Sequence, residues 1–177
     1  MFRTKSKRRA LKILGALTLP EPWDSHQFVE QVARARGRRI HLSAVPAEVM
    51  DDKTCGLWVN ADSEDYLLYS EDSPAWHADL VICHELSHML FEHDLEVTTG
   101  QQPAPARQPT DVDGLAAFLP DLDPDAVRSV LGRSGFTARR EFEAEYLATL
   151  ILDRATSSGN DSRQTRMLST FLGADTR

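Results

Sequence analysis

The chain has 177 residues, of which 41% are hydrophobic, a size and composition typical of one globular domain with its own core. Lys and Arg number 20 against 27 Asp and Glu, a net charge of −7, and this acidic balance argues against nucleic-acid binding across the main surface. The two cysteines, Cys55 and Cys83, lack CxxC spacing, which excludes a disulfide-rich scaffold and favours two buried thiols in a reducing cytoplasm.

Residues 1–22 are predicted to form a basic arm or helix. The first twelve residues hold six basic side chains and no acidic one. Such an arm could contact nucleic acid or an acidic partner, but we expect it to be solvated or docked on the protein's own body. The largely apolar stretch from Ile13 to Leu19 is only seven residues long and offers no small-x-small cleavage site, so we do not expect an export signal. No segment approaches the ~20 apolar residues of a membrane span.

Residues 23–156 are predicted to form the main domain, which opens with a helix from Asp24 to Arg36. Asp24 and Gln27 form a capping-box pattern, and Gly37 is a stop signal. Trp23 and Phe28 have the spacing of a hydrophobic staple. The next predicted elements are a short strand over 39–42 and a two-stranded ribbon over 55–60 and 65–69. His26 and His41 are interpreted as ordinary surface or edge residues.

A third predicted helix, over about 74–92, carries the most informative motif of the chain. Ser73 and Pro74 supply an N-cap and N1 signal, and the string His84-Glu85-Leu86-Ser87-His88 lies in an almost entirely apolar stretch. Positions i and i+4 share a helix face, so the two imidazoles can bind one Zn²⁺ while Glu85 stands beside them as a general base. The alternative is a pair of histidines that merely hydrogen-bond in the core.

A catalytic zinc site needs a third protein ligand. Three candidates follow the motif: His93, the acidic residues near 121, and the run of residues 141–145. On an ideal helix His93 is rotated about 140° from the ligand face, so it would serve only if the helix ended first. The residues near 121 lie among prolines and are typical of a solvated loop. The glutamate run opens a second apolar segment, over 146–152, that is long enough to pack against the first helix.

At this point the chain resembles the ImmA/IrrE metallopeptidases, gluzincin-like enzymes in which the HExxH helix is followed by a helix carrying Glu-x-x-Ala-Asn/Asp. The matching register is Glu141-Phe142-Glu143-Ala144-Glu145. The resemblance implies that Glu141 is the third ligand and that Glu145, at a position usually held by Asn or Asp, orients a ligand histidine. Glu143 is the alternative ligand. The resemblance covers about 24–93 and 137–152.

The resemblance also implies a function. We expect an α+β zincin-like domain, a small sheet packed on the HExxH helix and on the helix with the third ligand, that acts as a cytoplasmic zinc-dependent endopeptidase. Mn or Fe could replace Zn. An edge strand would receive the substrate backbone, and the substrate would be a helix-turn-helix transcriptional repressor encoded nearby, sometimes in a toxin–antitoxin-like pair. Four residues remain candidates for stabilising the oxyanion: Tyr66, His77, His93 and Tyr146.

Two regions and two rival functions complete the expectations. Residues 94–136 are interpreted as an insertion, with a loop over 101–109 and short helices over 111–119 and 125–131, that either covers the cleft or decorates the surface. Residues 157–177 are interpreted as a tail with a helix over 164–172. The main rival is a catalytically silent partner that acts by binding a helix-turn-helix protein. A nucleic-acid-binding toxin that uses the basic arm is the second.

Overall fold

The computed structural model describes residues 2–50, 56–61, 63–93, 114, 118–119 and 136–158. This part of the chain contains helices and a small sheet, so the α+β class is confirmed. Its elements, in chain order, are α1 (Phe2–Ala16), α2 (Ser25–Arg36), β1 (Arg39–Val45), the 3₁₀ turn η1 (Ala47–Val49), β2 (Gly56–Asn60), β3 (Glu64–Ser70), α3 (Ala75–Leu90) and α6 (Ala138–Ser158). The predictions for Cys55, for the acidic residues near 121, for the helices within 94–136 and for the tail beyond 158 fall outside the described residues.

The three strands form one sheet in the order β1-β3-β2. The predicted ribbon is confirmed, because β2 pairs antiparallel with β3, with Trp58 opposite Leu67. The strand predicted over 39–42 continues to Val45 and pairs parallel with β3. Within the described residues no strand pairs with the other edge of β2.

Buried Asp65 ties the sheet to the neighbouring helices. Its carboxylate accepts hydrogen bonds from the Trp58 indole at 3.0 Å and from Arg38 at 3.1 Å. Arg36 approaches the same carboxylate at 3.7 Å and donates at 2.7 Å to the carbonyl of Met89 near the end of α3. A buried carboxylate needs such partners, and here they fix β2 and α2 relative to α3.

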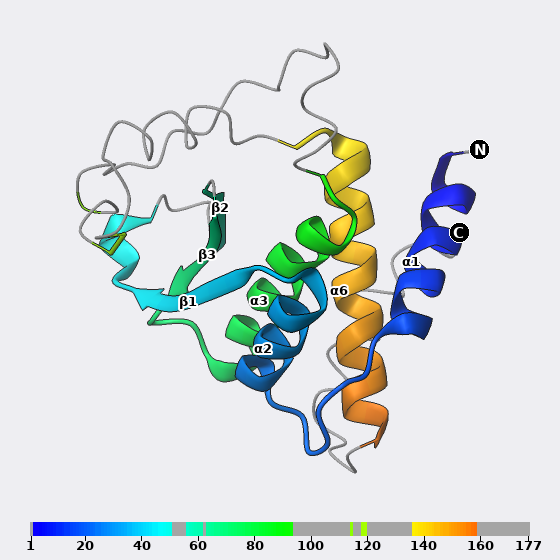
Figure 1. Ribbon diagram of the computed structural model, residues 1–177, viewed down its shortest axis with the longest axis horizontal. Helices are drawn as coiled ribbons and strands as arrows, with labels where there is room; N and C mark the ends of the chain where they lie inside the picture. Colours follow the sequence, from blue (N-terminus) through cyan, green and yellow to red (C-terminus); the bar gives the residue numbers. More distant parts are fainter. Residues whose placement is uncertain are drawn as a thin grey trace.

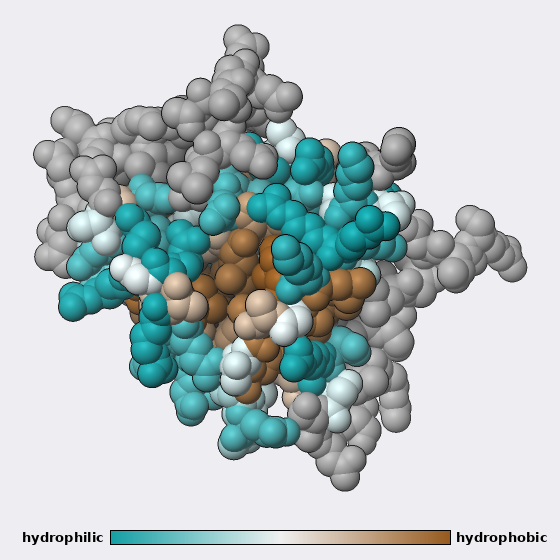
Figure 2. Space-filling view, turned by 45° about the vertical axis from the view of Figure 1, so that its right-hand side comes forward, coloured by the Kyte–Doolittle hydropathy of each residue, from teal (hydrophilic) through white to brown (hydrophobic). Residues whose placement is uncertain are grey.

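Helix α3 lies between the sheet and α6, and α1 packs along α6 (Figure 1). The main core lies between these layers and contains Phe28, Leu67, Ile82, Leu86, Met89, Leu147 and Ile151. Of the two expectations for the basic segment, solvated or docked, the structure shows docking on the protein's own body, because Ala10 is fully buried and Arg154 donates to the carbonyl of Leu14. Figure 2 brings the α1 side forward and shows hydrophobic residues at the surface within a rim of hydrophilic ones. In the described residues no helix is long and apolar enough to cross a membrane.

The helix ends follow the sequence signals in one case and depart from them in another. Asp24 caps α2 by accepting from the Gln27 N–H at 3.0 Å, and Gly37 ends it in the left-handed conformation with φ 66°. The N-cap predicted at Ser73 is wrong by one residue: Pro74 is the N-cap of α3 and offers no side-chain acceptor. The Ser73 hydroxyl instead lies 3.2 Å from the Nδ1 of His77.

Candidate metal centre

One turn of α3 and the first turn of α6 bring three potential ligands together. The Nε2 atoms of His84 and His88 are 3.1 Å apart. The Oε2 atom of Glu141 is 3.4 Å from the first nitrogen and 3.8 Å from the second. Ligand atoms about 2.0–2.1 Å from a tetrahedral Zn²⁺ are about 3.3–3.4 Å from one another, and the three distances bracket that value. Two imidazoles and a carboxylate are also a donor set that zinc favours, so these residues could hold a metal ion.

Packing between the two helices sets this geometry. Small Ala144 and Ala148 face the core together with Leu147, which lets α6 approach α3 closely. The ring of Phe136, just before α6, stacks on His88 with 3.8 Å between centroids and 17° between planes. This stacking fixes the plane of the buried imidazole, and no periodicity of the sequence points to it.

The protonation states favour cation binding. Burial raises the pKa of Glu141, but the neighbouring imidazoles of His84 and His88 outweigh burial and lower that pKa to about 2. Burial also lowers the pKa of His84, and the nearby carboxylates of Glu141 and Glu85 reverse the net shift, so the pKa is raised. The pocket is therefore negative enough to stabilise a positive charge placed between these side chains.

Glu85 lies beside the three potential ligands and is not a member of that group. Its side chain is buried, and burial is the main reason why its pKa is raised. The backbone N–H of Trp58 on β2 donates a hydrogen bond to its carboxylate. A buried carboxylate that has a raised pKa and is held by one backbone N–H is suited to accept and release a proton.

Strand β2 passes very close to this glutamate. A Cβ atom added at Gly56 would lie 2.3 Å from Cγ1 of Val81 and 3.2 Å from Oε1 of Glu85, so only glycine fits without displacement. The Trp58 hydrogen bond and the Gly56 contact together place the outer edge of β2 across the carboxylate. Neither contact can be read from the sequence, because both depend on how the strand packs against α3.

The structure corrects the expectation that ideal helix geometry gives for His93. Helix α3 ends at Leu90, and Glu92 adopts a left-handed conformation with φ 57°. The N–H of Glu92 donates to the Met89 carbonyl and the N–H of His93 to the His88 carbonyl, the bond pattern of a Schellman motif without its usual glycine. The turn folds His93 back into the core, where its Nδ1 lies 2.8 Å from the Nδ1 of His88. His93 thus contacts the Nδ1 side of His88 and is not a member of the candidate metal group.

The glutamates of α6 have different surroundings. Glu143, the alternative ligand, is buried away from the metal group, with Oε2 3.2 Å from Nε2 of His93 and Oε1 accepting from Ser6 and Arg139. Glu145 is expected from the resemblance to orient a ligand histidine, but its side chain is exposed and acts on His84 only through its charge. The residue that contacts a ligand imidazole is His93, which sequence reasoning places elsewhere.

The other residues considered for the site make contacts of their own. Tyr66 stacks on His41, and Tyr146 lies under the ammonium of Lys7. Cys83 is fully buried, as expected, and burial raises the pKa of its thiol well above its usual value, so it is a poor ligand.

Comparisons of the chain with protein-family models, with curated proteins and with solved structures found no match. What the site can do therefore follows from its own residues.

Proposed function

We propose that this chain is a zinc-dependent endopeptidase with a zincin-like fold, as the resemblance to the ImmA/IrrE metallopeptidases implies. One observation carries the proposal: His84, His88 and Glu141 converge at the distances of a tetrahedral site, and a buried glutamate that is not a ligand stands beside them. Zn²⁺ is the proposed metal on the donor set, with Mn²⁺ and Fe²⁺ as alternatives.

In this proposal a bound zinc ion supplies Lewis acidity that polarises the scissile carbonyl and makes an attacking water more acidic. Glu85 takes the proton of that water, because burial raises the pKa of this carboxylate and makes it a stronger base. Glu85 then passes the proton to the leaving amine. The Trp58 N–H holds the carboxylate while it does so.

The edge of β2 that pairs with no strand among the described residues supports a peptide as substrate. An extended chain can add to a strand edge through main-chain hydrogen bonds, and this edge passes directly over Glu85. The resemblance extends the proposal to a helix-turn-helix transcriptional repressor encoded nearby, in a cytoplasmic pair of the toxin–antitoxin type. The rival function, a silent partner that only docks to such a repressor, gains nothing from a general base.

Metal content tests the site first. Purified protein should carry about one Zn²⁺ per chain, and His84→Ala or His88→Ala should abolish it, as elemental analysis can measure. A protein that arrives without metal and takes up no added Zn²⁺, Mn²⁺ or Fe²⁺ would contradict the proposal.

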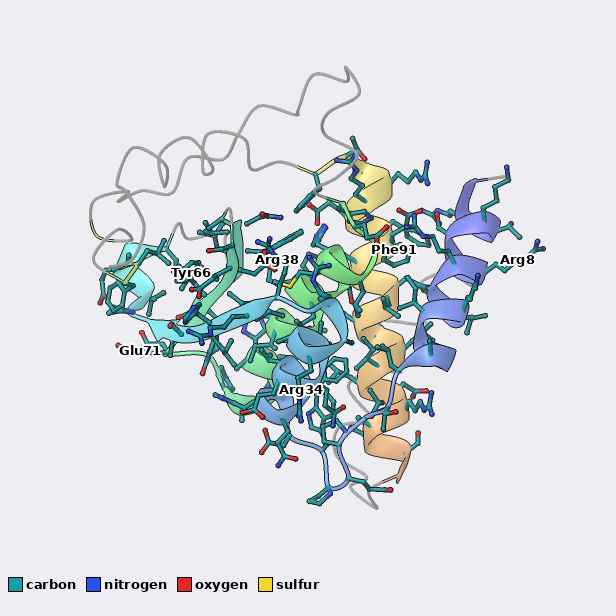
Figure 3. All side chains as sticks on the ribbon, viewed as in Figure 1. Arg8, Arg34, Arg38, Tyr66, Glu71 and Phe91 are labelled. Atoms are coloured by element: carbon teal, nitrogen blue, oxygen red, sulfur yellow. The ribbon has the colours of Figure 1, made fainter. Side chains whose placement is uncertain are left out.

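Glu85→Gln then separates peptidase from docking protein. The change keeps the side-chain volume and removes the base, so metal content should stay intact while hydrolysis of the neighbouring repressor falls by at least about 10²- to 10⁴-fold. Glu71→Gln is the matched control, because Glu71 is an exposed glutamate at the end of the sheet (Figure 3). If wild type and Glu85→Gln relieve repression of a reporter equally, with the repressor uncut in both, the docking function replaces the peptidase.

A further inference from the structure

A continuous line of polar contacts runs from His88 to the N-terminal helix. Nδ1 of His88 lies 2.8 Å from Nδ1 of His93, and Nε2 of His93 lies 3.2 Å from Oε2 of Glu143. The other oxygen of Glu143 accepts from the Ser6 hydroxyl at 2.5 Å. The contacts join α3, the turn after it, α6 and α1. Residues 6 and 143 lie 137 positions apart in the sequence.

The atoms along this line allow one consistent set of protons. Only one of the two facing Nδ1 atoms can carry the hydrogen between them. If Nε2 of His88 is to offer its lone pair to a cation, the hydrogen must be on Nδ1 of His88, and Nδ1 of His93 accepts it. His93 then carries its own hydrogen on Nε2 and donates it to Glu143. From Nδ1 of His88 to Glu143 every facing atom then has a partner, and Nε2 of His84, 3.1 Å from Nε2 of His88, can donate to that lone pair when no cation is bound.

The alternative direction fails at the far end. A neutral His93 with its hydrogen on Nδ1 would point a bare Nε2 lone pair at the Glu143 carboxylate, which is repulsive. The Ser6 hydroxyl and the Arg139 guanidinium both donate to Oε1 of Glu143, so this carboxylate is the acceptor at the end of the line.

Helix α1 holds this line at two points. Ser6 is 3% exposed, and among the described residues it is the only one whose hydroxyl donates a hydrogen bond to the Glu143 carboxylate. Arg9 donates to the Phe91 carbonyl at 2.9 Å and lies over the Phe91 ring, and that ring stacks on His93 at 5.3 Å. Figure 3 shows Phe91 at the end of α3 next to α6, whereas Arg8 points away from the body. The inner face of α1 therefore reaches His93 indirectly, through Glu143 and Phe91.

We propose that His93 and Glu143, anchored by Ser6 of α1, are positioning residues that hold His88 in the tautomer with a free Nε2, so that the N-terminal helix is part of the metal centre. The inference rests on the proposed metal site, but its first test uses the metal-free protein. Ligand histidines commonly donate their second ring N–H to a carboxylate or carbonyl. Here a histidine stands between the ligand and the carboxylate.

Nitrogen-detected NMR of the histidine rings in metal-free protein reads the tautomer directly. Wild type should show His88 protonated on Nδ1. His93→Phe, which keeps a ring but no acceptor, should release His88 to a mixture of tautomers. His93→Gln should restore the Nδ1–H form, because its amide oxygen can accept from His88 while its NH₂ group donates to Glu143. A His88 tautomer that is the same in wild type and in His93→Phe would overturn the inference.

Metal affinity supplies the second test, with Co²⁺ as the probe in chelator competition. His93→Phe should bind Co²⁺ about 10- to 100-fold more weakly than wild type, with an altered visible spectrum, and His93→Gln should recover most of the loss. Ser6→Ala should cause a smaller loss in the same direction, and Thr4→Ala, which removes an exposed hydroxyl of α1, should cause none. Wild type that binds no metal at all defeats the proposed function, whereas wild type and all four variants binding equally defeats only this inference.

Discussion

At the scale of single residues, the left-handed turn at Glu92 stores strain. A side chain in this conformation costs about 1 kcal/mol, and α2 ends in the same motif with glycine at the corresponding place. Glu92→Gly should therefore stabilise the protein by about 0.5–1 kcal/mol, measured by urea unfolding with chelator present. Gly37→Ala is the mirror experiment and should destabilise by about 1 kcal/mol. Destabilisation by Glu92→Gly would mean that the glutamate side chain, not the backbone, holds the turn.

At Gly56 the space available for a side chain determines how a substitution changes stability. Gly56→Ala should destabilise by about 1–3 kcal/mol, because its Cβ would overlap Val81, and it should disturb Glu85 as well. Gly15→Ala is the control: no atom lies within 4 Å of that Cβ, and an exposed helical position gains from alanine. Thermal unfolding of the two variants compares them. Equal stabilities would show that β2 moves away from α3 at little cost.

At the scale of elements, α6 presents two glutamates to opposite ends of one imidazole. Glu141 faces the Nε2 side of His88, and Glu143 reaches its Nδ1 side through His93. Glu141→Ala should abolish metal retention, whereas Glu143→Ala should weaken it by about 10- to 100-fold. Chelator competition on both variants gives the comparison. Loss of metal from the second variant alone would shift the ligand to position 143.

The elements also show how much of the fold and of the candidate site can be predicted from the sequence. The ribbon, α2 with its caps and the two apolar helices follow from periodicity and turn residues. In the candidate metal group, His84 and His88 follow from the HExxH spacing, and Glu141 follows from the family resemblance. The partners of these groups do not follow, because they depend on tertiary contacts. His93 reaches His88 through a turn whose left-handed residue is not a glycine, and Glu85 meets a backbone N–H that carries no side-chain signal. The resemblance alone gives Glu145 its expected role, and that side chain lies exposed.

At the scale of the whole molecule, buried titrating groups predict how stability depends on pH in metal-free protein. The pKa of His93 is about 4 in the folded protein, against an ordinary value of 6.5 for the unfolded chain. Between these pH values the unfolded chain binds a proton that the folded chain does not, so stability should fall as the pH drops from 6.5 to 4. Glu141, with a pKa of about 2 against an ordinary 4.5, adds a further loss below pH 4.5.

Urea unfolding at about pH 7, 6 and 5 with chelator measures this dependence. His93→Gln should flatten the slope above about pH 5, because the glutamine does not titrate. His26→Gln is the control, since His26 is exposed, and should leave the slope unchanged. An unchanged slope in His93→Gln would place the titrating group elsewhere.

If the β2 edge that lies unpaired among the described residues receives the substrate, as proposed, the substrate must be extended there. Only an extended backbone can pair along that edge, because the N–H and C=O groups within a helix are already hydrogen-bonded to one another. A protein built of helices would have to open locally, or to offer an interdomain linker, before any of its bonds came near Glu85. In the proposed peptidase, the choice of bond would then follow the local unfolding free energy of the target more closely than its residue sequence, and a ligand or stress that loosens one segment of the target would select where it is cut.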